Sequence, residues 1–309
     1  MRAVLGFLLF YARFGFSFTR VGLHWRQRKF QAFDHALQGQ HVVVTGASGG
    51  IGAAVVAGCV AQGATVTAVA RNPAKLAPLQ EAHGDAVTPY VCDLAETDAV
   101  RKLAADLSAG PAVDVLVNNV GVLLPEYEEN SRGTDAQFAT NLLNQFVLTE
   151  TLKDNGGLAA DAGIVMVASG GMYMAPLALP RIMADSADRH DGTTAYAIQK
   201  RAQVLLADYW QSRETGHRQW HVMHPGWVDT AGVQRSLPTF RKVLQRWLRN
   251  AVEGADTIVW LASQRPAAPR PVQIWFDRSL HKVHVYGFTR GGTDDGERLV
   301  ALLRECAQR

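Results

Sequence analysis

The sequence predicts an α/β fold in which a doubly wound, mostly parallel sheet of seven strands carries helices on both faces. From Gln40 onward, short β-branched runs alternate with Ala- and Leu-rich stretches of helical length, an order typical of a parallel sheet. The strand-like runs are almost continuously apolar, as expected of strands that are buried on both faces. The chain of 309 residues is 48% hydrophobic and 19% charged, which is a globular composition.

The expected elements follow one another in regular order. Strands are expected at residues 41–45, 64–70, 86–92, 113–118, 163–168, 219–224 and 272–276. Helices are expected at about 50–62, 74–82, 96–108, 134–153, 194–214, 240–262 and 294–307. Gly63 suits the end of the first helix and Pro73 the first turn of the second. Thr134 with Gln137 predicts a capping box at the start of the fourth helix.

Two regions are expected, a basic and aromatic N-terminal extension at residues 1–39 and one domain at residues 40–309. Residues 1–33 contain six Lys or Arg side chains and no acidic one. The apolar run at 3–12 is too short to cross a bilayer. Three interpretations stay open: a helix in the membrane interface whose arginines meet anionic lipid, a segment packed on the protein's own body or on a partner chain, and a targeting or disordered leader.

Charge and cysteine content argue against several classes of protein. The net charge of +3 gives no reason to expect a nucleic-acid partner. Cys59, Cys92 and Cys306 lie far apart without a CxxC pair, which argues against a disulfide scaffold and a zinc site and favours a reducing, cytoplasmic location. The histidines at 217, 221 and 224 lack the acidic partner of an HExxH motif, so no metal is expected.

A glycine-rich turn joins the first expected strand to the first expected helix. Glycine lets the backbone turn tightly and approach a pyrophosphate, and the start of the helix offers free N–H groups. A turn of this kind after a strand and before a helix predicts a dinucleotide site. The expected contact residues of this turn are Thr45, Gly46, Ser48, Gly50, Ile51 and Gly52.

The spacing Thr45-Gly46-x-x-x-Gly50-x-Gly52 resembles the fingerprint of the short-chain dehydrogenase/reductase family, and further marks follow in order over residues 40–280. The resemblance implies a Rossmann-type domain that binds NAD or NADP. It implies further cofactor contacts at Asp93, Leu94, Asn119, Gly121, Pro225 and Gly226. It also implies a catalytic tetrad of Asn141, Ser169, Tyr196 and Lys200, of which Tyr196 and Lys200 also contact the cofactor.

The ends of the expected strands support the same site independently. Doubly wound sheets bind ligands at the carboxyl edge of their strands. Polar or turn-forming residues end six of the expected strands, namely Thr45, Arg71, Asp93, Asn118, Ser169 and Pro225. Packing alone does not account for such a convergence at one edge.

The pair Tyr196 and Lys200 suggests the chemistry, because residues four apart share one face of a helix. A phenol has a pKa of about 10, and we expect the neighbouring ammonium to lower it toward working pH. Tyr196 would then donate a proton to a carbonyl or take one from an alcohol, while Ser169 hydrogen-bonds the substrate oxygen. The resemblance implies that Lys200 binds the nicotinamide ribose and that Asn141 holds a water linked to Lys200. The alternative role for Asn141 is a brace between neighbouring strands.

The end of the second expected strand favours NADP(H) over NAD(H). Arg71 stands where an acidic residue would bind the ribose hydroxyls of NAD, and its planar cation suits a 2′-phosphate. The basic residue that often precedes the middle glycine of the fingerprint is missing, because this position is Gly49. Ser48 could supply a hydrogen bond in its place.

The substrate side predicts a small-molecule carbonyl or alcohol of lipophilic character. Ser169 and Tyr196 lie 27 positions apart, and the segment between them is rich in methionine, a side chain that suits an adaptable apolar pocket. Trp227 and Phe240 could form the opposite wall. A lid or interface loop that merely packs is the alternative for the inserted segment.

Two other functions stay open at this stage, a dinucleotide sensor without catalysis and a scaffold at a membrane surface. A peripheral membrane contact through residues 1–33 and a homo-oligomer are both compatible with the sequence. If the enzyme reading is right, removal of residues 1–33 should leave hydride transfer intact.

Overall fold

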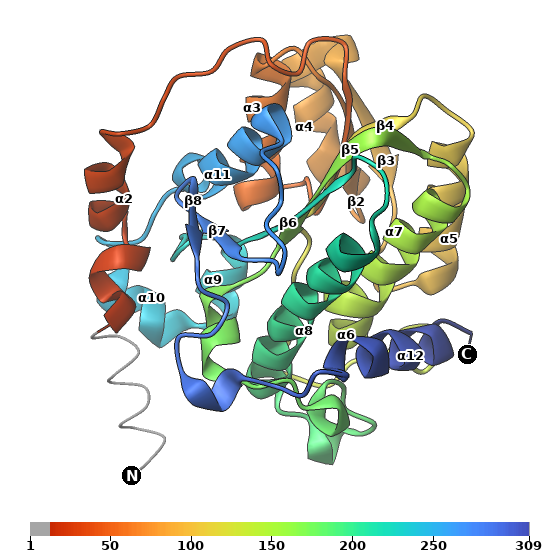
Figure 1. Ribbon diagram of the computed structural model, residues 1–309, viewed down its shortest axis with the longest axis vertical. Coiled ribbons are helices and arrows are strands. Elements are labelled where there is room, and N and C mark those ends of the chain that lie inside the picture. The colour runs from red at the N-terminus through yellow and green to blue at the C-terminus, as the bar shows by residue number, and fades with distance from the viewer. Residues whose placement is uncertain (1–12, 309) are drawn as a thin grey trace.

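The computed structural model describes residues 13–308. One sheet of eight strands runs through the molecule in the order β3-β2-β1-β4-β5-β6-β7-β8 (Figure 1). All neighbouring strands are parallel except β7 and β8. The strands are β1 (His41–Thr45), β2 (Thr65–Ala70), β3 (Val87–Val91), β4 (Val113–Asn118), β5 (Leu158–Val167), β6 (Gln219–Met223), β7 (Ile274–Phe276) and β8 (Ser279–His281).

The seven expected parallel strands are confirmed, and β8 is an eighth that the sequence pattern did not indicate. It is a three-residue edge strand whose side chains are all exposed, so it has no apolar alternation to detect. The two residues between β7 and β8, Asp277 and Arg278, both have positive φ, at 48° and 56°. This is the conformation that a tight type I′ hairpin requires.

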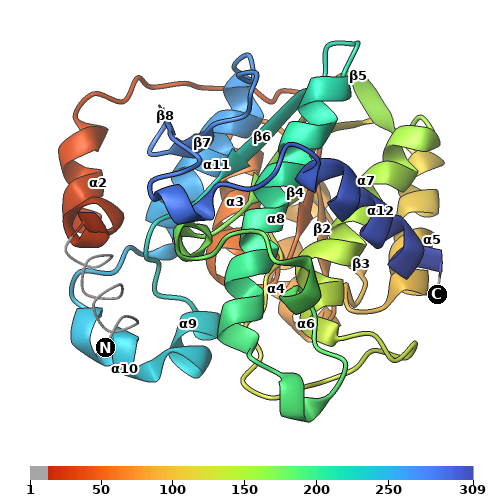
Figure 2. The same ribbon diagram turned by 60° about the horizontal axis from the view of Figure 1, so that its bottom comes forward.

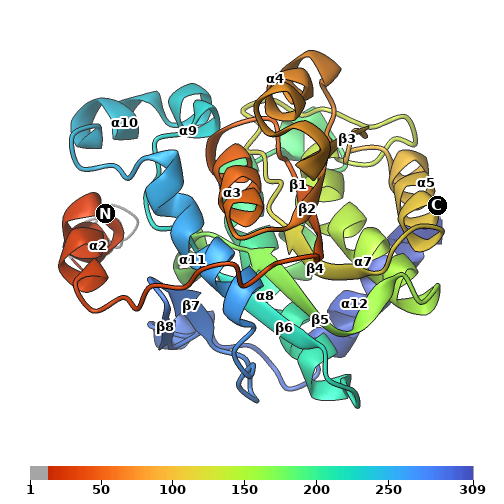
Figure 3. The same ribbon diagram turned by 90° about the horizontal axis from the view of Figure 1, so that it is seen from above.

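Helices cover both faces of the sheet, as expected. They are α2 (Arg20–Gln27), α3 (Gly50–Ala61), α4 (Pro73–His83), α5 (Thr97–Ser108), α6 (Ala136–Phe138), α7 (Asn144–Asp154), α8 (Gly192–Arg213), α9 (Ala231–Ser236), α10 (Pro238–Leu244), α11 (Ala251–Gln264) and α12 (Asp295–Gln308). Two apolar cores separate the layers, with α3, α4 and α11 on one face and α5, α7, α8 and α12 on the other (Figure 3). Within residues 13–308, no helix is long and apolar enough to span a bilayer.

The fourth expected helix begins one residue late and is interrupted. Asp135, not Thr134, caps it, because the Asp135 carboxylate accepts a hydrogen bond from the N–H of Gln137 at 2.8 Å. After α6 the chain makes a π-helical turn at Ala139–Leu143, and α7 continues from there. Such turns are frequent at functional sites, and this one contains Asn141.

The expected helix at 240–262 is wrong, because the structure divides this stretch into α10 and α11. The Asn250 side chain accepts from the N–H of Glu253 at 2.8 Å, and the Glu253 carboxylate accepts from the N–H of Asn250 at 2.8 Å. This capping box starts α11 afresh. Leu248 and Arg249, which precede it, are buried, so the apolar pattern runs across the break without marking it.

Residues 13–29 of the N-terminal extension pack against the protein's own body, as one of the three interpretations proposed. Phe14 and Phe18 are buried, and their rings stack on Tyr173 with centroids 5.3 Å and 6.5 Å away. The three rings belong to the apolar core that also contains α7 and α8. Residues 1–12 lie outside the described part of the chain.

A buried carboxylate joins the extension to the rest of the molecule. Asp277 accepts hydrogen bonds from Arg249 at 2.6 Å and from Arg26 at 2.7 Å. The Arg249 guanidinium also donates to the backbone carbonyl of Phe18 at 3.1 Å. Removal of residues 1–33 would therefore open a core and leave Asp277 with one arginine. We therefore expect this deletion to destabilise the fold, so that a loss of hydride transfer in it would not distinguish an enzyme from a scaffold.

Candidate active site

The glycine turn between β1 and α3 has the shape of a phosphate cradle. Gly46 and Gly50 have φ of 68° and 53°, the left-handed region that glycine adopts readily. A Cβ atom on Gly52 would lie 2.1 Å from the carbonyl oxygen of Gly46. A side chain at Gly52 is therefore excluded, and the backbone N–H groups at the start of α3 stay open toward the sheet edge. Ile51, by contrast, lies against Gly254 of α11 and packs there.

The end of β4 braces this turn. The Thr45 hydroxyl donates to the carbonyl of Val117 at 3.2 Å and accepts from the N–H of Asn119 at 3.0 Å. The Asn119 side chain donates to the carbonyl of Thr45 at 2.8 Å. In this structure Asn119 thus fixes the shape of the cradle. β1 and β4 are adjacent in the sheet although not in the chain, and such a switch in strand order is where doubly wound sheets bind ligands.

Three of the predicted catalytic side chains come together beside this edge. Ser169 follows β5, and its hydroxyl lies near enough to the Tyr196 phenol to lower the pKa of that phenol. The Lys200 ammonium lies 5.6 Å from the centre of the Tyr196 ring. It donates to the carbonyl of Val167 at 2.9 Å, and a Cβ atom on Gly121 would lie 3.1 Å from it. The site therefore has a hydroxyl, a phenol and an amine within one small volume.

Burial dominates the ionisation of the phenol and the amine. Burial lowers the pKa of Lys200 to about 7. Burial raises the pKa of Tyr196, and the nearby Ser169 hydroxyl partly lowers it. The expectation that Lys200 brings the Tyr196 pKa down is not met in this structure, because desolvation penalises both charged forms. The favoured state is a neutral phenol, the form that can donate a proton.

Asn141 is held by protein groups. Its Oδ1 accepts from the N–H of Val122 at 2.7 Å, and its Nδ2 donates to the carbonyl of Val122 at 2.8 Å. Nδ2 also donates to Oε1 of Gln199 at 2.8 Å. A Cβ atom on Gly121 would lie 3.7 Å from Asn141 Oδ1, so the side chain borders the Lys200 amine. These contacts brace the loop after β4 against α8, and not two neighbouring strands as the alternative role for Asn141 supposed.

Sequence reasoning missed two buried glutamines beside Tyr196 and Lys200. Gln199 donates to the carbonyl of Ile182 at 2.8 Å and so fastens the inserted segment to α8. Gln203 donates to the carbonyl of Asn141 at 2.8 Å. Positions 196, 199, 200 and 203 follow the spacing of one helical face. A stripe of four polar residues at that spacing was the available signal.

The other predicted cofactor residues lie along the same sheet edge. Asp93 accepts from the N–H of Ala95 at 3.0 Å, and Leu94 beside it is buried. Gly226 has a φ of 76°, and a Cβ atom there would lie 2.7 Å from the Arg249 guanidinium. Arg249 also donates to the carbonyl of Pro225 at 3.1 Å. The structure thus brings the strand ends together, and it shows Arg249 as a support of the turn after β6.

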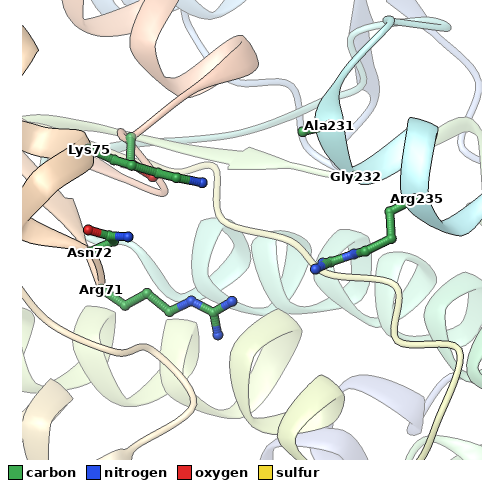
Figure 4. A pocket seen from close by; sticks show the side chains of 7 residues that line it. Arg71, Asn72, Lys75, Ala231, Gly232 and Arg235 are labelled. Atoms are coloured by element: carbon green, nitrogen blue, oxygen red, sulfur yellow. The ribbon is translucent and has the colours of Figure 1, made fainter.

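A pocket of about 390 Å³ lies beyond the glycine turn and is lined by cations. Arg71, at the end of β2, and Arg235, on α9, extend into it from opposite sides, and Lys75 of α4 also faces it (Figure 4). Ser48, Asn72, Ala231 and Gly232 complete the lining. Lys75 and Arg235 were not predicted, because only the fold brings α4 and α9 next to the end of β2.

The segment between Ser169 and Tyr196 divides into two parts. Met172 and Tyr173 are buried and pack in the core, as the alternative interpretation held. Leu179 and Met183, in contrast, line a pocket of about 750 Å³ together with Leu302 of α12. Figure 2 shows this segment below α8. Only its second half is therefore available to line a cavity.

The loop after β6 carries Trp227, one of the residues expected to form the other wall. Trp227 packs edge-on against Phe240, with ring centroids 5.4 Å apart. Its N–H donates to the carbonyl of Phe18 at 2.9 Å, and its own carbonyl accepts from the N–H of Arg249 at 2.8 Å. The N-terminal extension and α10 thus hold this wall in place. Sequence reasoning named Trp227 and Phe240 but not the link to Phe18.

Comparison with known proteins agrees with this geometry. The model of the short chain dehydrogenase family matches residues 40–178. Dehydrogenase/reductase SDR family member 12 of Bos taurus is 32% identical over 302 residues, which cover 95% of each chain. Retinol dehydrogenase 14 of Homo sapiens is 29% identical over 74% of this chain and 75% of its own.

A solved structure from Beutenbergia cavernae, which is named as an NAD(P)-dependent gluconate 5-dehydrogenase with bound NADP, is 26% identical in sequence to this chain. Its TM-score is 0.58 over 75% of this chain and 92% of its own. The predicted resemblance is confirmed by the family match and by the relative that spans nearly the whole chain. The chain belongs to the short-chain dehydrogenase/reductase family, whose enzymes act on CH–OH or C=O groups with NAD(P).

Proposed function

We propose that this protein is an NADP(H)-dependent oxidoreductase that interconverts a lipophilic carbonyl compound and its alcohol. The observation that carries the proposal is the cluster of Ser169, Tyr196 and Lys200 beside a glycine turn shaped for a dinucleotide. A non-catalytic sensor is disfavoured, because all three side chains are present and in contact range.

The roles of the three residues follow from their chemistry. The bound nicotinamide supplies the hydride chemistry. In reduction, the neutral Tyr196 phenol donates its proton to the carbonyl oxygen as negative charge develops there. The Ser169 hydroxyl donates a hydrogen bond to the same oxygen and stabilises that charge. In oxidation the proton moves from the alcohol to Tyr196.

Lys200 acts on Tyr196 rather than on the substrate. With a pKa of about 7, its amine can be charged or neutral near neutral pH. When charged, it stabilises the phenolate left after proton donation. The resemblance to the family further assigns it to the nicotinamide ribose. Asn141, fixed through Val122 and Gln199, would position the backbone around this amine.

The cation pocket supports the preference for NADP(H). Arg71, Lys75 and Arg235 place three positive side chains around one cavity at the far end of the glycine turn. The charge suits the 2′-phosphate that distinguishes NADP from NAD. We expect the double variant Arg71→Ala/Arg235→Ala to lose tenfold or more in affinity for NADPH, since a hydrogen bond to a charged group contributes about 1.5–3 kcal/mol.

Fluorescence titration of both cofactors tests this preference. NADH binding should change little in the double variant, and Lys102→Ala, an exposed cation on α5, should bind NADPH like the parent. Tighter binding of NADH than of NADPH by the parent protein would contradict the preference.

Several features support a lipophilic substrate. Leu179 and Met183 contribute apolar side chains to a cavity that is also lined by Arg181, Asp185, Arg189 and Asp191. Trp227 and Phe240 pack together in the segment expected to form the opposite wall. A relative that is 29% identical bears the name retinol dehydrogenase 14, and retinol is a lipophilic alcohol. A peripheral membrane contact through the N-terminal extension would suit such a substrate.

The decisive experiment is a screen of aldehydes, ketones and alcohols of increasing chain length, followed by NADPH absorbance. We expect turnover that improves with apolar chain length and depends on Tyr196. No turnover of any carbonyl or alcohol with either cofactor would contradict the proposal, as would equal turnover by Tyr196→Phe.

A further inference from the structure

Positive charge is concentrated in two segments that are far apart in the chain. Residues 13–33 contain five Lys or Arg side chains and no acidic residue, and residues 230–252 likewise contain five and none. The whole chain has a net charge of only +3. The remainder of the protein is therefore acidic, and the two segments differ from it in electrostatic character.

Exposed apolar side chains are concentrated in the same segments. Within residues 13–308, ten large apolar side chains are exposed, and seven of them lie on these two segments. They are Phe16, Val21, Trp25, Leu237, Val243, Trp247 and Val252. Trp25 and Trp247 are 56% and 52% exposed and Val243 is 72% exposed. Exposed tryptophans in a soluble body call for a partner that covers them.

The two segments form one continuous face. The N–H of Arg20, at the start of α2, donates to the carbonyl of Trp247 just after α10 at 2.9 Å. α2 and α10 lie side by side at the same end of the molecule in all three views (Figures 1–3). We call the exposed surface of residues 16–29 and 239–247 the docking face. Glu253 borders it, but its carboxylate already binds His24 at 2.6 Å and caps α11.

Some cations of the docking face form ion pairs within the protein, and four others do not. Arg26, Arg249 and Arg241 form ion pairs with aspartates. Arg28 and Lys29 on one segment, and Lys242 and Arg246 on the other, are exposed. None of these four forms an ion pair among residues 13–308. Their charge is therefore available to an acidic partner.

We propose that the docking face binds the surface of an anionic lipid bilayer. Helices that lie on membranes combine exposed Trp, Phe and aliphatic side chains with Lys and Arg, since the apolar groups enter the acyl boundary while the cations meet lipid headgroups. In the sequence, the apolar residues Leu5, Phe7, Leu8, Leu9 and Phe10 precede Arg13. An acidic protein would satisfy the charges but would give no reason for this continuing apolar sequence.

The position of the docking face deepens the proposed function, on which this step rests. Trp227, the wall of the substrate side, is held by Phe18 on one edge and by Arg249 on the other. Phe18 precedes α2, and Arg249 follows α10. Binding of the docking face would thus bring the substrate wall close to the bilayer, so that a lipophilic substrate could enter from the lipid.

Co-sedimentation of the full chain with vesicles tests the proposal without substrate, so a failure of binding is distinct from a failure of catalysis. We expect binding to phosphatidylcholine vesicles that contain phosphatidylserine, and much weaker binding to phosphatidylcholine alone. Lys242→Glu/Arg246→Glu should bind anionic vesicles at least tenfold more weakly, because each surface cation contributes about a fivefold effect, from roughly 1 kcal/mol per charge. Trp247→Ser should weaken the part of the binding that persists at high salt.

Arg101→Glu/Lys102→Glu is the matched control, because it makes the same charge change on α5, at the opposite end of the molecule (Figure 1). It should bind anionic vesicles nearly as well as the parent. If both double variants lost the same affinity for anionic vesicles, the net charge of the protein would explain the binding, and the proposal would be overturned. Unchanged binding of the α10 variant would assign binding to the N-terminal segment alone and also overturn the proposal. If the parent does not bind anionic vesicles, the proposal is wrong, and an acidic protein becomes the expected partner of the docking face.

Discussion

At the scale of single residues, the candidate chemistry depends on how burial treats two ionisable groups. Tyr196 and Lys200 are four residues apart on α8, yet their separation in sequence does not fix their protonation. Desolvation raises the pKa of the phenol and lowers that of the amine to about 7. Both effects favour neutral forms. The site therefore starts from a state that can donate a proton from Tyr196.

Replacement of Tyr196 by Phe should remove the proton donor without harming the fold. We expect kcat to fall by about 10²–10⁴-fold, the range of a positioned acid or base, with an unchanged melting temperature. Tyr209→Phe, on the same helix, is the matched control. The centre of the Tyr209 ring lies 3.9 Å from the Arg213 guanidinium carbon, and position 209 is on a different face of the helix from position 196. A kcat for Tyr196→Phe equal to that of Tyr209→Phe would exclude the role of proton donor.

The lowered pKa of Lys200 predicts a pH-dependent cost in stability. The unfolded chain holds the lysine proton up to about pH 10.5, whereas the folded chain releases it near pH 7. Stability therefore rises with pH across this window, and the cost is largest below pH 7. Lys200→Met does not bear this cost. The difference in the free energy of unfolding between Lys200→Met and the parent should therefore change by about 2–3 kcal/mol in favour of the parent between pH 7 and pH 9.5.

Urea unfolding of the dinucleotide-free parent and of Lys200→Met at both pH values measures this change. Other titrating groups are common to both proteins and cancel in the difference. If the difference in the free energy of unfolding between the two proteins stays constant with pH, the pKa of Lys200 is not lowered in the folded protein.

At the scale of elements, the glycine turn and the N-terminal extension both act through close approach. At the turn, α3 begins within contact distance of the strand that feeds it, which leaves room for hydrogen alone at Gly52. In the extension, residues 13–18 are helical, so Phe14 and Phe18 share one face and Phe16 lies on the other. One face enters the core, while the other stays in solvent.

Gly52→Ala should damage the cradle. The added methyl would meet the backbone of Gly46, so the turn must shift, at a cost of about 1–3 kcal/mol in folding free energy. Dinucleotide affinity should fall at least tenfold, measured by fluorescence titration. Gly287→Ala is the control, because a Cβ atom there meets nothing within 4 Å. Equal affinities for the two variants would refute this account of the turn.

Phe18→Ala should show that the extension is part of the folded body. Phe18 is 2% exposed and contacts the rings of Tyr173, His224 and Phe276. We expect a loss of about 3–5 kcal/mol in the free energy of unfolding. Phe16→Ala, two residues away and 60% exposed, should change it by no more than about 0.5 kcal/mol. Denaturant unfolding measures the free energy of unfolding of both variants. If both substitutions lowered it by a similar small amount, the extension would not be a packed part of the folded body.

At the scale of the whole molecule, one acidic side chain joins three distant parts of the chain. Asp277, in the β7–β8 turn, binds Arg26 of α2 and Arg249 ahead of α11. The two ion pairs connect the docking face, the edge of the sheet and the loop after β6. We therefore expect a substitution of Asp277 to alter the packing of all three.

Asp277→Ala should destabilise the protein by about 3–5 kcal/mol, because it leaves the buried Arg249 without its counter-charge. Asp98→Ala is the control, because the side chains of Asp98 and its partner Arg132 are 68% and 32% exposed, and the loss of such a surface pair should cost about 1 kcal/mol or less. Thermal or urea unfolding distinguishes the two. Equal losses would indicate that burial of the Arg249–Asp277 pair has no special weight.

Much of the parallel sheet could be predicted from the sequence, because buried strands leave continuous apolar runs and helix starts leave local caps. Prediction failed where the deciding contact was not local or the pattern was too short. Asp135 competes with Thr134 for the same cap, and a capping box at Asn250 breaks an apolar pattern that reads as continuous. The three exposed residues of β8 carry no pattern.

The sequence by itself determined the glycine turn, the Tyr196–Lys200 spacing and the strand-end residues, because each is a local arrangement of a few positions. Only the tertiary structure decided that Lys75 and Arg235 join Arg71 around one pocket, that Phe18 supports Trp227, and that α2 and α10 share a face. The physical reason is distance along the chain: contacts between remote segments depend on how the layers pack, and a local pattern holds no record of that packing.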